Sequence, residues 1–169
     1  MDPVIEATLR GALALLLIAV AVHKARDLAA FHATLANYRL LPPPATWPAA
    51  VIVVCAEPFA AGCLVVRPMI GVLVTATLLT GYTAAIAVNL ARGRRDIDCG
   101  CAGPAHRQPL RPWLLVRNAA LIIAALACLL PGRVRPIVWV DAFTVGATIA
   151  VLAALYVSVE RLASLRELA

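Results

Sequence analysis

The chain has 169 residues, of which 63% are hydrophobic and only 14% are charged. Soluble domains are about 45–50% apolar, and a chain this short has too little interior to bury the excess, so the composition argues against a soluble protein and predicts residence in a lipid bilayer. The net charge of +6 does not indicate nucleic-acid binding, because basic residues between apolar stretches pin helix ends to anionic headgroups.

Five apolar stretches predict membrane-spanning α-helices, at about residues 4–22, 45–66, 69–91, 113–130 and 137–159. At a rise of about 1.5 Å per residue, even the shorter stretches are just long enough for a hydrocarbon core of about 30 Å. The first stretch follows Met1-Asp2-Pro3 rather than the basic segment of a signal peptide, so we expect a retained helix.

Residues 23–44 mix charged and apolar side chains, and their first part predicts an amphipathic helix at the membrane interface. The run Pro42-Pro43-Pro44 ends any helix there. We therefore expect an all-α fold, with one integral membrane domain over residues 1–169. We expect this domain to be a polytopic transmembrane helical bundle, with a four-helix core and a fifth, C-terminal span.

The distribution of basic residues predicts which side of the membrane each loop faces. With five spans, the loops after the first and third spans share a side with the C-terminus, and this side carries ten basic residues: Lys24, Arg26, Arg39, Arg92, Arg94, Arg95, Arg107, Arg111, Arg161 and Arg166. The other side carries four: Arg10, Arg67, Arg133 and Arg135. The positive-inside rule therefore places the longest polar loop, residues 92–112, in the cytoplasm.

A small set of polar residues inside the predicted spans is a second candidate for function: Glu57, Arg10, Arg117 and Asn118. A carboxylate in mid-span is costly and is usually functional. Glu57 is expected either to pair with Arg10 or Arg117, which orients two helices, or to bind a proton or a cationic substrate. Arg117 is interpreted as snorkelling to the interface, and Lys24 as an interface anchor.

The strongest chemical motif is Cys99-Gly100-Cys101, in the polar loop. Two thiols separated by one glycine can close a strained disulfide, which is readily reduced and so suits a redox pair. Metal binding by both thiolates with His106 and a further ligand is an alternative, as is a pair without a role; no metal is assigned. The other cysteines lie in apolar stretches and are interpreted as inert thiols: Cys55, Cys63 and Cys128.

Taken together, the motifs resemble a known family. The pattern consists of His23-Lys24, Tyr38, Leu41-Pro42, Glu57, Gly93-Arg94, Asp98-Cys99-Gly100-Cys101 and Arg117-Asn118. In this combination, about residues 8–130 resemble the methylamine utilization protein MauE family, which is grouped with DoxX-like, redox-associated membrane proteins. The chain departs from the family pattern at Ala102-Gly103, where an aromatic residue often precedes the glycine, and this departure leaves both thiols intact.

The resemblance implies a multi-pass protein of the cell inner membrane that supports methylamine utilization. Methylamine dehydrogenase has a small subunit that is periplasmic and dense in disulfides, and MauE-like proteins are thought to support its processing, export or disulfide formation. The substrate is then that subunit or another extracytoplasmic protein, with a thioredoxin-like periplasmic partner. Quinone is a candidate electron acceptor, and no cofactor is assigned.

These expectations leave three functional hypotheses. In the first, Cys99 and Cys101 are the catalytic redox pair of a thiol–disulfide oxidoreductase, although enzymatic activity itself stays open. In the second, the chain is a non-catalytic membrane scaffold for a thioredoxin-like partner. In the third, it is a small transporter that uses Glu57, which the shortness of the chain disfavours.

Overall fold

The computed structural model describes residues 1–100, 109–131 and 138–165, with side chains of the last helix described to residue 159. Within these residues the chain forms six helices and no strand: α1 (Pro3–Arg26), α2 (Leu28–Asn37), α3 (Pro43–Val66), α4 (Pro68–Ala91), α5 (Pro112–Ala127) and α6 (Trp139–Leu165). The all-α prediction is therefore confirmed.

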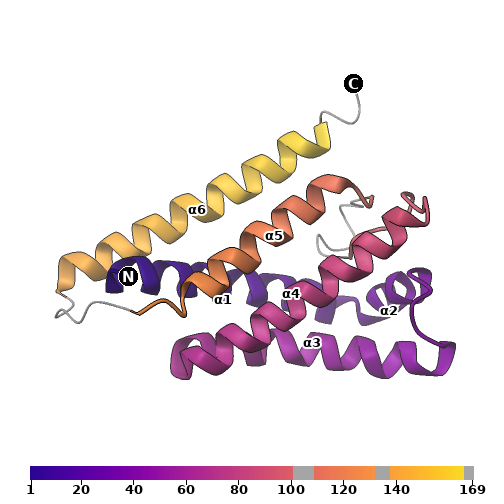
Figure 1. Ribbon diagram of the computed structural model, residues 1–169, viewed down its shortest axis with the longest axis horizontal. Helices are drawn as coiled ribbons and strands as arrows, with labels where there is room; N and C mark the ends of the chain where they lie inside the picture. Colours follow the sequence, from indigo (N-terminus) through magenta and orange to yellow (C-terminus); the bar gives the residue numbers. More distant parts are fainter. Residues whose placement is uncertain (101–108, 132–137, 166–169) are drawn as a thin grey trace.

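Four of the helices form a closed ring, in which α1 contacts α3, α3 contacts α4, α4 contacts α5 and α5 returns to α1 (Figure 1). Helix α2 lies against α3 and α1 at one end of this ring, and α6 packs on α1 from outside. The ring and the outer helix match the expected four-helix core with a fifth, C-terminal helix.

Helices α1, α3, α4 and α6 are long and apolar enough to cross a membrane. Helix α5 is also apolar but is shorter, with 16 residues. The chain is thus a multi-pass membrane protein. Helix α1 continues to Arg26 instead of ending near Val22, so Lys24 belongs to the helix. The amphipathic segment expected after the first span forms α2. Asp27 is the N-cap residue of this helix, and its side chain accepts a hydrogen bond from the backbone N–H of Ala30 at 2.9 Å.

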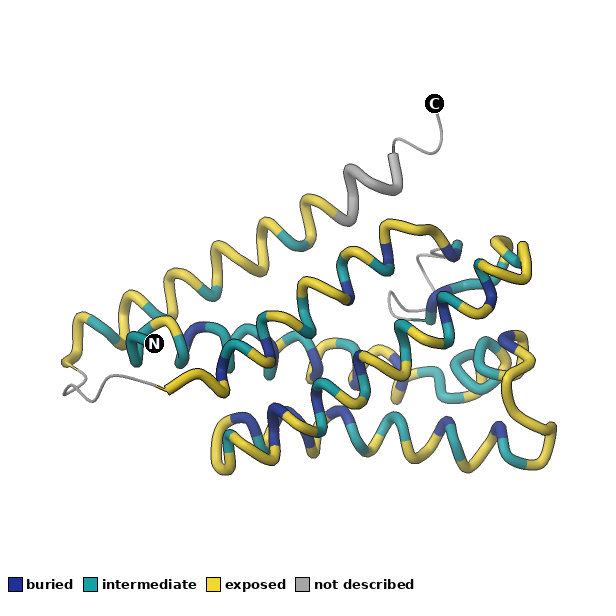
Figure 2. The backbone as a smooth tube through the Cα atoms, viewed as in Figure 1, coloured by how far each residue is buried: buried dark blue, intermediate teal, exposed yellow. Residues whose placement is uncertain are grey.

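Exposed residues run along all the helices (Figure 2). Many of them carry large apolar side chains, as a protein solvated by lipid requires. Trp139 and Phe143 of α6 are 82% and 73% exposed, and Met69 of α4 is 67% exposed. Much of the buried interior is instead small or polar, and the buried polar or charged residues are Thr8, Lys24, Thr46, Glu57, Thr75, Asn89 and Asn118. The interior of the ring is therefore the place to look for a site.

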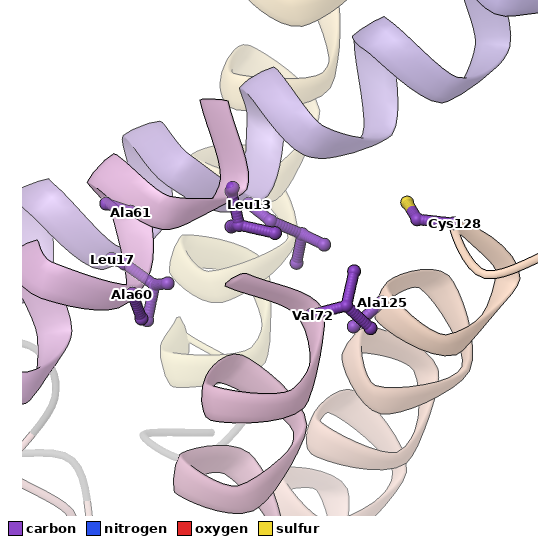
Figure 3. Packing of buried hydrophobic residues seen from close by; sticks show 8 residues of the cluster. Leu13, Leu17, Ala60, Ala61, Val72, Ala125 and Cys128 are labelled. Atoms are coloured by element: carbon purple, nitrogen blue, oxygen red, sulfur yellow. The ribbon is translucent and has the colours of Figure 1, made fainter. Parts of the chain in front are cut away.

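One apolar cluster joins all four helices of the ring (Figure 3). Its buried members are Leu13, Leu17, Ala60, Ala61, Leu64, Val72, Ala125 and Cys128. The alanines of α3 present little bulk to their neighbours, which allows close helix contact in a membrane. This cluster fixes the ring toward the α3–α4 turn.

The opposite end of the ring is where α1 and α4 end and where α3 and α5 begin (Figure 1). We call this end, with α2 and residues 92–100, the loop end. It gathers most of the chemistry considered from the sequence.

Candidate functional site

A buried ion pair links α1 to α3 inside the ring. The Lys24 ammonium donates to Oε1 of Glu57, and the side chains are 3% and 0% exposed. Lys24 is therefore not an interface anchor, and Glu57 does not pair with Arg10 or Arg117 as the sequence suggested. The reason for the difference is that α1 runs past Val22, which carries Lys24 along the helix face that meets α3.

Helix α4 completes this ion pair with a hydroxyl group. Tyr82 donates to Oε1 of Glu57 at 2.6 Å, and its oxygen lies 3.3 Å from Nζ of Lys24. Nζ also lies 4.6 Å from the centroid of the Tyr82 ring and 4.7 Å from that of Phe31 in α2. The ammonium is thus held by a carboxylate and two aromatic faces.

The second carboxylate oxygen of Glu57, Oε2, takes no part in these contacts. Oε2 is buried, and among the described residues it has no hydrogen-bond partner. An ionised carboxylate has about four acceptor positions, and here both contacts fall on Oε1. Oε2 is therefore the atom at which a proton can be bound without breaking either existing contact.

Arg10 has a different role from the one expected. Its Nε and Nη2 donate to the carbonyl oxygens of Leu64 and Val65 at 2.8 and 3.1 Å, and its Nη1 donates to Glu6 at 3.0 Å. These carbonyl groups belong to the last turn of α3. At the end of a helix, carbonyl groups have no backbone N–H of the same helix to accept from. Arg10 therefore caps α3 at the end of the ring opposite the loop end.

Cys99 is buried at the loop end, with 8% of its surface exposed. It packs in an apolar cluster with Tyr38, the C-cap residue of α2, and with Ile86 of α4 and Leu114 of α5. The hydroxyl of Tyr38 donates to the carbonyl oxygen of Cys99 at 3.4 Å. Cys99 is therefore buried among residues from α4, α5 and the end of α2. The other candidates in this loop, Cys101 and His106, lie outside the described residues.

The base of the cysteine loop is closed by backbone contacts. The N–H of Leu110 donates to the carbonyl oxygens of Arg95 and Ile97 at 3.1 and 3.0 Å, and Asp98 forms an isolated antiparallel bridge with Pro109. Leu110 itself is completely buried. These contacts hold the residues before Cys99 beside the residues that lead into α5.

Arg94 fastens the same loop to the end of α2. Its Nη2 donates to the carbonyl oxygen of Asn37 at 2.8 Å, and its Nη1 donates to that of Tyr38 at 3.3 Å and to Oδ1 of Asn89 at 3.1 Å. Asn89 is completely buried in α4. Since the carbonyls at a helix C-terminus favour a cation, Arg94 connects α2, α4 and the cysteine loop through one side chain.

Gly100 places the cysteine loop beside Phe31, the aromatic residue that also lies next to Lys24. Its φ is +74°, a region that glycine adopts without steric cost, and its N–H donates to Oδ1 of Asp98 at 3.2 Å. A Cβ at this position would lie 3.1 Å from Cγ2 of Thr34 and 3.6 Å from Cδ2 and Cε2 of Phe31. The ring of Phe31 thus lies beside Gly100 as well as beside the Lys24 ammonium.

The remaining polar pair of the sequence, Arg117 and Asn118, lies together in α5. Nε and Nη2 of Arg117 are each 3.3 Å from Oδ1 of Asn118. Among the described residues, Nδ2 of Asn118 and Oγ1 of Thr75 are buried without a hydrogen-bond partner. Both groups can donate to a carbonyl oxygen, which is chemistry that suits the polar end of a quinone.

The other cysteines do not join these groups. Cys55 is exposed, Cys63 is partly exposed, and the thiol of buried Cys128 donates to the carbonyl oxygen of Ala124 at 3.4 Å. The structure instead adds Tyr82 and Phe31, which sequence reasoning missed. A tyrosine in the middle of an apolar span was the available signal for Tyr82, because a phenolic hydroxyl needs a partner there; Phe31 has no distinguishing signal.

Comparisons with known proteins give a consistent result. The family model described as methylamine utilisation protein MauE matches residues 2–131, which contain α1 to α5 and the cysteine loop. Relatives named methylamine utilization protein MauE include those of Paracoccus denitrificans, 37% identical over 75% of this chain and 69% of the relative, and Methylorubrum extorquens, 39% identical over 77% and 72%. The relative from Paracoccus versutus is 36% identical over 80% and 74%. No solved structure matches the chain.

Proposed function

Because the chain belongs to the methylamine utilisation protein MauE family, we propose that it serves methylamine utilization as a thiol–disulfide maturation factor of the cell inner membrane. Its redox pair is Cys99 and Cys101. The observation that carries the proposal is the anchoring of the loop, since Arg94 and Tyr38 hold Cys99 at a defined place at the end of the helix ring. A loop that only connected two spans has no need of such fixed contacts.

The reaction follows from the chemistry of two neighbouring thiols. A disulfide between Cys99 and Cys101 is attacked by a thiolate of a substrate protein, which forms a mixed disulfide, and a second substrate thiolate then releases the pair as two thiols. The substrate loses two electrons and two protons, and gains one disulfide. Its class is a disulfide-rich extracytoplasmic protein such as the methylamine dehydrogenase small subunit.

The reduced pair must then be oxidised again. A thioredoxin-like periplasmic protein is one exchange partner for the thiols. A membrane quinone is the other candidate, and it supplies a two-electron, two-proton acceptor when bound. Thr75 and Asn118 are the residues whose spare donors suit it.

The side of the membrane on which the loop lies is a separate test of this proposal. With Lys24 withdrawn into the bundle, the sequence count becomes nine basic residues on the side of the cysteine loop against four on the other. The positive-inside rule therefore still predicts that the loop faces the cytoplasm. Maturation of an extracytoplasmic substrate needs the opposite orientation. A membrane-impermeant thiol reagent applied to spheroplasts, with and without prior reduction, is expected to label Cys101 only after reduction; labelling that requires membrane disruption contradicts the proposal.

The decisive experiment replaces the redox pair. The Cys99→Ser and Cys101→Ser double variant is expected to abolish formation of active methylamine dehydrogenase in a methylamine-grown host, with the substrate's cysteines still reduced. The matched control is the Cys55→Ser and Cys63→Ser double variant, which removes two thiols from α3 and is expected to be silent. If maturation proceeds at the wild-type level without Cys99 and Cys101, the redox proposal is wrong.

A scaffold for a thioredoxin-like partner is the second candidate function. The observation in its favour is that the loop is anchored through backbone carbonyls, including that of Cys99, so its shape does not depend on a thiol. This alternative expects cysteine substitutions to be silent and the Arg94→Ala variant to be damaging. A transporter that binds a cationic substrate at Glu57 is disfavoured, because the Lys24 ammonium already lies beside the carboxylate.

A further inference from the structure

The buried ion pair and the cysteine loop share one side chain, the ring of Phe31. On one contact, the ring centroid lies 4.7 Å from the Lys24 ammonium. On the other contact, two carbons of the ring lie 3.6 Å from the position that a Cβ would take on Gly100, the residue that follows Cys99. The ring of Phe31 therefore lies between the buried Lys24 ammonium and Gly100, the residue that follows Cys99.

We propose that Lys24 is a counter-ion shared by Glu57 and the Cys99 thiolate, and that it acts as a positioning residue for the thiol chemistry. This inference rests on the proposed function of Cys99. While Cys99 is a thiol, Lys24 neutralises Glu57. When Cys99 becomes a thiolate, Glu57 holds the proton and the charge of Lys24 acts on the sulfur through the low-dielectric interior, where charge interactions are strong.

The step is a proton transfer and moves no electrons. The S–H bond of Cys99 breaks, and an O–H bond forms at Oε2 of Glu57. Oε2 is suited to this because it is buried and, within the described part of the chain, unpartnered, while Lys24 and Tyr82 both stay on Oε1. The cluster holds one positive and one negative charge before and after the step, so no net charge is created in the membrane.

The other charged and titratable groups that surround the cluster already have fixed contacts. In order along the chain, Asp27 caps α2, His32 lies 2.9 Å from Oγ1 of Thr46, Tyr82 donates to Glu57, Arg94 binds the carbonyl oxygens of Asn37 and Tyr38, and Asp98 accepts from Gly100. Asp98 is the nearest carboxylate in sequence to Cys99, and it accepts a hydrogen bond from the N–H of Gly100. Among these groups, Glu57 alone combines an ion pair with a spare buried oxygen atom.

The test measures the rate at which iodoacetamide alkylates Cys99 as a function of pH in the full-length, detergent-solubilised protein. Serine replaces Cys55, Cys63, Cys101 and Cys128, so that Cys99 is the single thiol. The Glu57→Gln variant mimics the protonated carboxyl and leaves Lys24 uncompensated. It is expected to alkylate about tenfold faster at neutral pH, with the rate profile moved to lower pH. The Lys24→Met variant is expected to alkylate about tenfold more slowly, with the profile moved to higher pH.

Opposite shifts separate an electrostatic role from structural damage, because loosening of the bundle accelerates alkylation in both variants. The Lys24→Met and Glu57→Gln double variant removes both charges and is expected to return close to the parent profile. The matched control is Glu6→Gln, which removes the carboxylate of the other ion pair, at the far end of α1, and is expected to leave the profile unchanged.

If the single charge variants fail to fold, the Tyr82→Phe variant keeps both charges and removes only the hydroxyl that stabilises Glu57. It is expected to accelerate alkylation about twofold to threefold. Unchanged profiles in Tyr82→Phe, or shifts of the same sign in Glu57→Gln and Lys24→Met, overturn the inference. The proposed function fails by a different result, namely normal substrate maturation without Cys99 and Cys101.

Discussion

The ammonium of Lys24 and the carboxylate of Glu57 form an ion pair between residues 33 positions apart, and both side chains are almost completely excluded from the surface. The pair ties the last turn of α1 to the middle of α3. It lies beside α2, which in turn supports the cysteine loop through Tyr38. The polar interior and the thiol motif are therefore neighbouring parts of one end of the molecule.

Removing either partner of this pair is expected to destabilise the fold strongly. A buried charge left without its partner costs about 3–5 kcal/mol, whereas removing both charges together is far less costly. We expect Lys24→Met and Glu57→Gln each to lower the free energy of unfolding by about that amount, and the double variant to cost less than either. Denaturant unfolding in micelles, followed by tryptophan fluorescence, measures all three; additive losses contradict the pairing.

Gly71 is expected to be irreplaceable for packing reasons. A Cβ there would lie 2.3 Å from the backbone nitrogen of Leu64 and 2.6 Å from the carbonyl carbon of Cys63, so α3 and α4 would have to separate. The Gly71→Ala variant should lose about 3 kcal/mol or more of stability. In the control Gly81→Ala, on the same helix, the added methyl group meets nothing within 4 Å, and we expect a change of less than about 1 kcal/mol.

Gly100 and Gly93 form a matched pair for testing how the loop is seated. Their φ angles are +74° and +72°, so alanine at either position introduces about 1–2 kcal/mol of backbone strain. Only at Gly100 does the methyl group also press on Thr34, at 3.1 Å. We expect Gly100→Ala to lift the loop from α2 and to speed alkylation of Cys99 severalfold, with Gly93→Ala close to the parent rate. Equal rates in the two variants contradict this seating.

Arg94 is expected to control access to Cys99. Its three hydrogen bonds join the loop to α2 and α4, and charge-assisted bonds of this kind contribute about 1.5–3 kcal/mol each. The Arg94→Ala variant should therefore expose Cys99 and raise its alkylation rate at least fivefold. Arg92, which donates one hydrogen bond of 3.4 Å to the carbonyl oxygen of Arg39, provides the control. A similar rise in Arg92→Ala would show that exposure does not depend on the Arg94 contacts.

Composition and periodic spacing were sufficient to predict the membrane, the helices and the chemical residues. Long apolar stretches can only be accommodated in lipid as helices, since every backbone polar group must be satisfied within the segment. For the same reason Glu57, in the middle of a span, stood out as a residue that needed an explanation. The cysteine motif was equally visible, because its chemistry depends on two residues that are close in sequence.

The partners of these residues could not be predicted in the same way. Lys24 follows directly after the first apolar stretch, where basic residues usually anchor a helix in the headgroups, and two arginines closer to mid-span offered Glu57 alternative partners. Which of them meets the carboxylate depends on where α1 ends and how it rotates against α3. One further turn of helix placed Lys24 inside and left Arg10 to cap the end of α3.

The sequence by itself thus determined that this protein is a bundle of membrane helices with one cysteine loop and a carboxylate in its interior. Only the tertiary structure decided that Lys24 and Tyr82 hold that carboxylate, and that α2 supports Cys99 and places Phe31 between loop and ion pair. The physical reason is that lipid solvates every apolar helix face almost equally. Hydropathy therefore specifies which segments are helices, whereas close packing and a few buried polar contacts specify how the helices face one another.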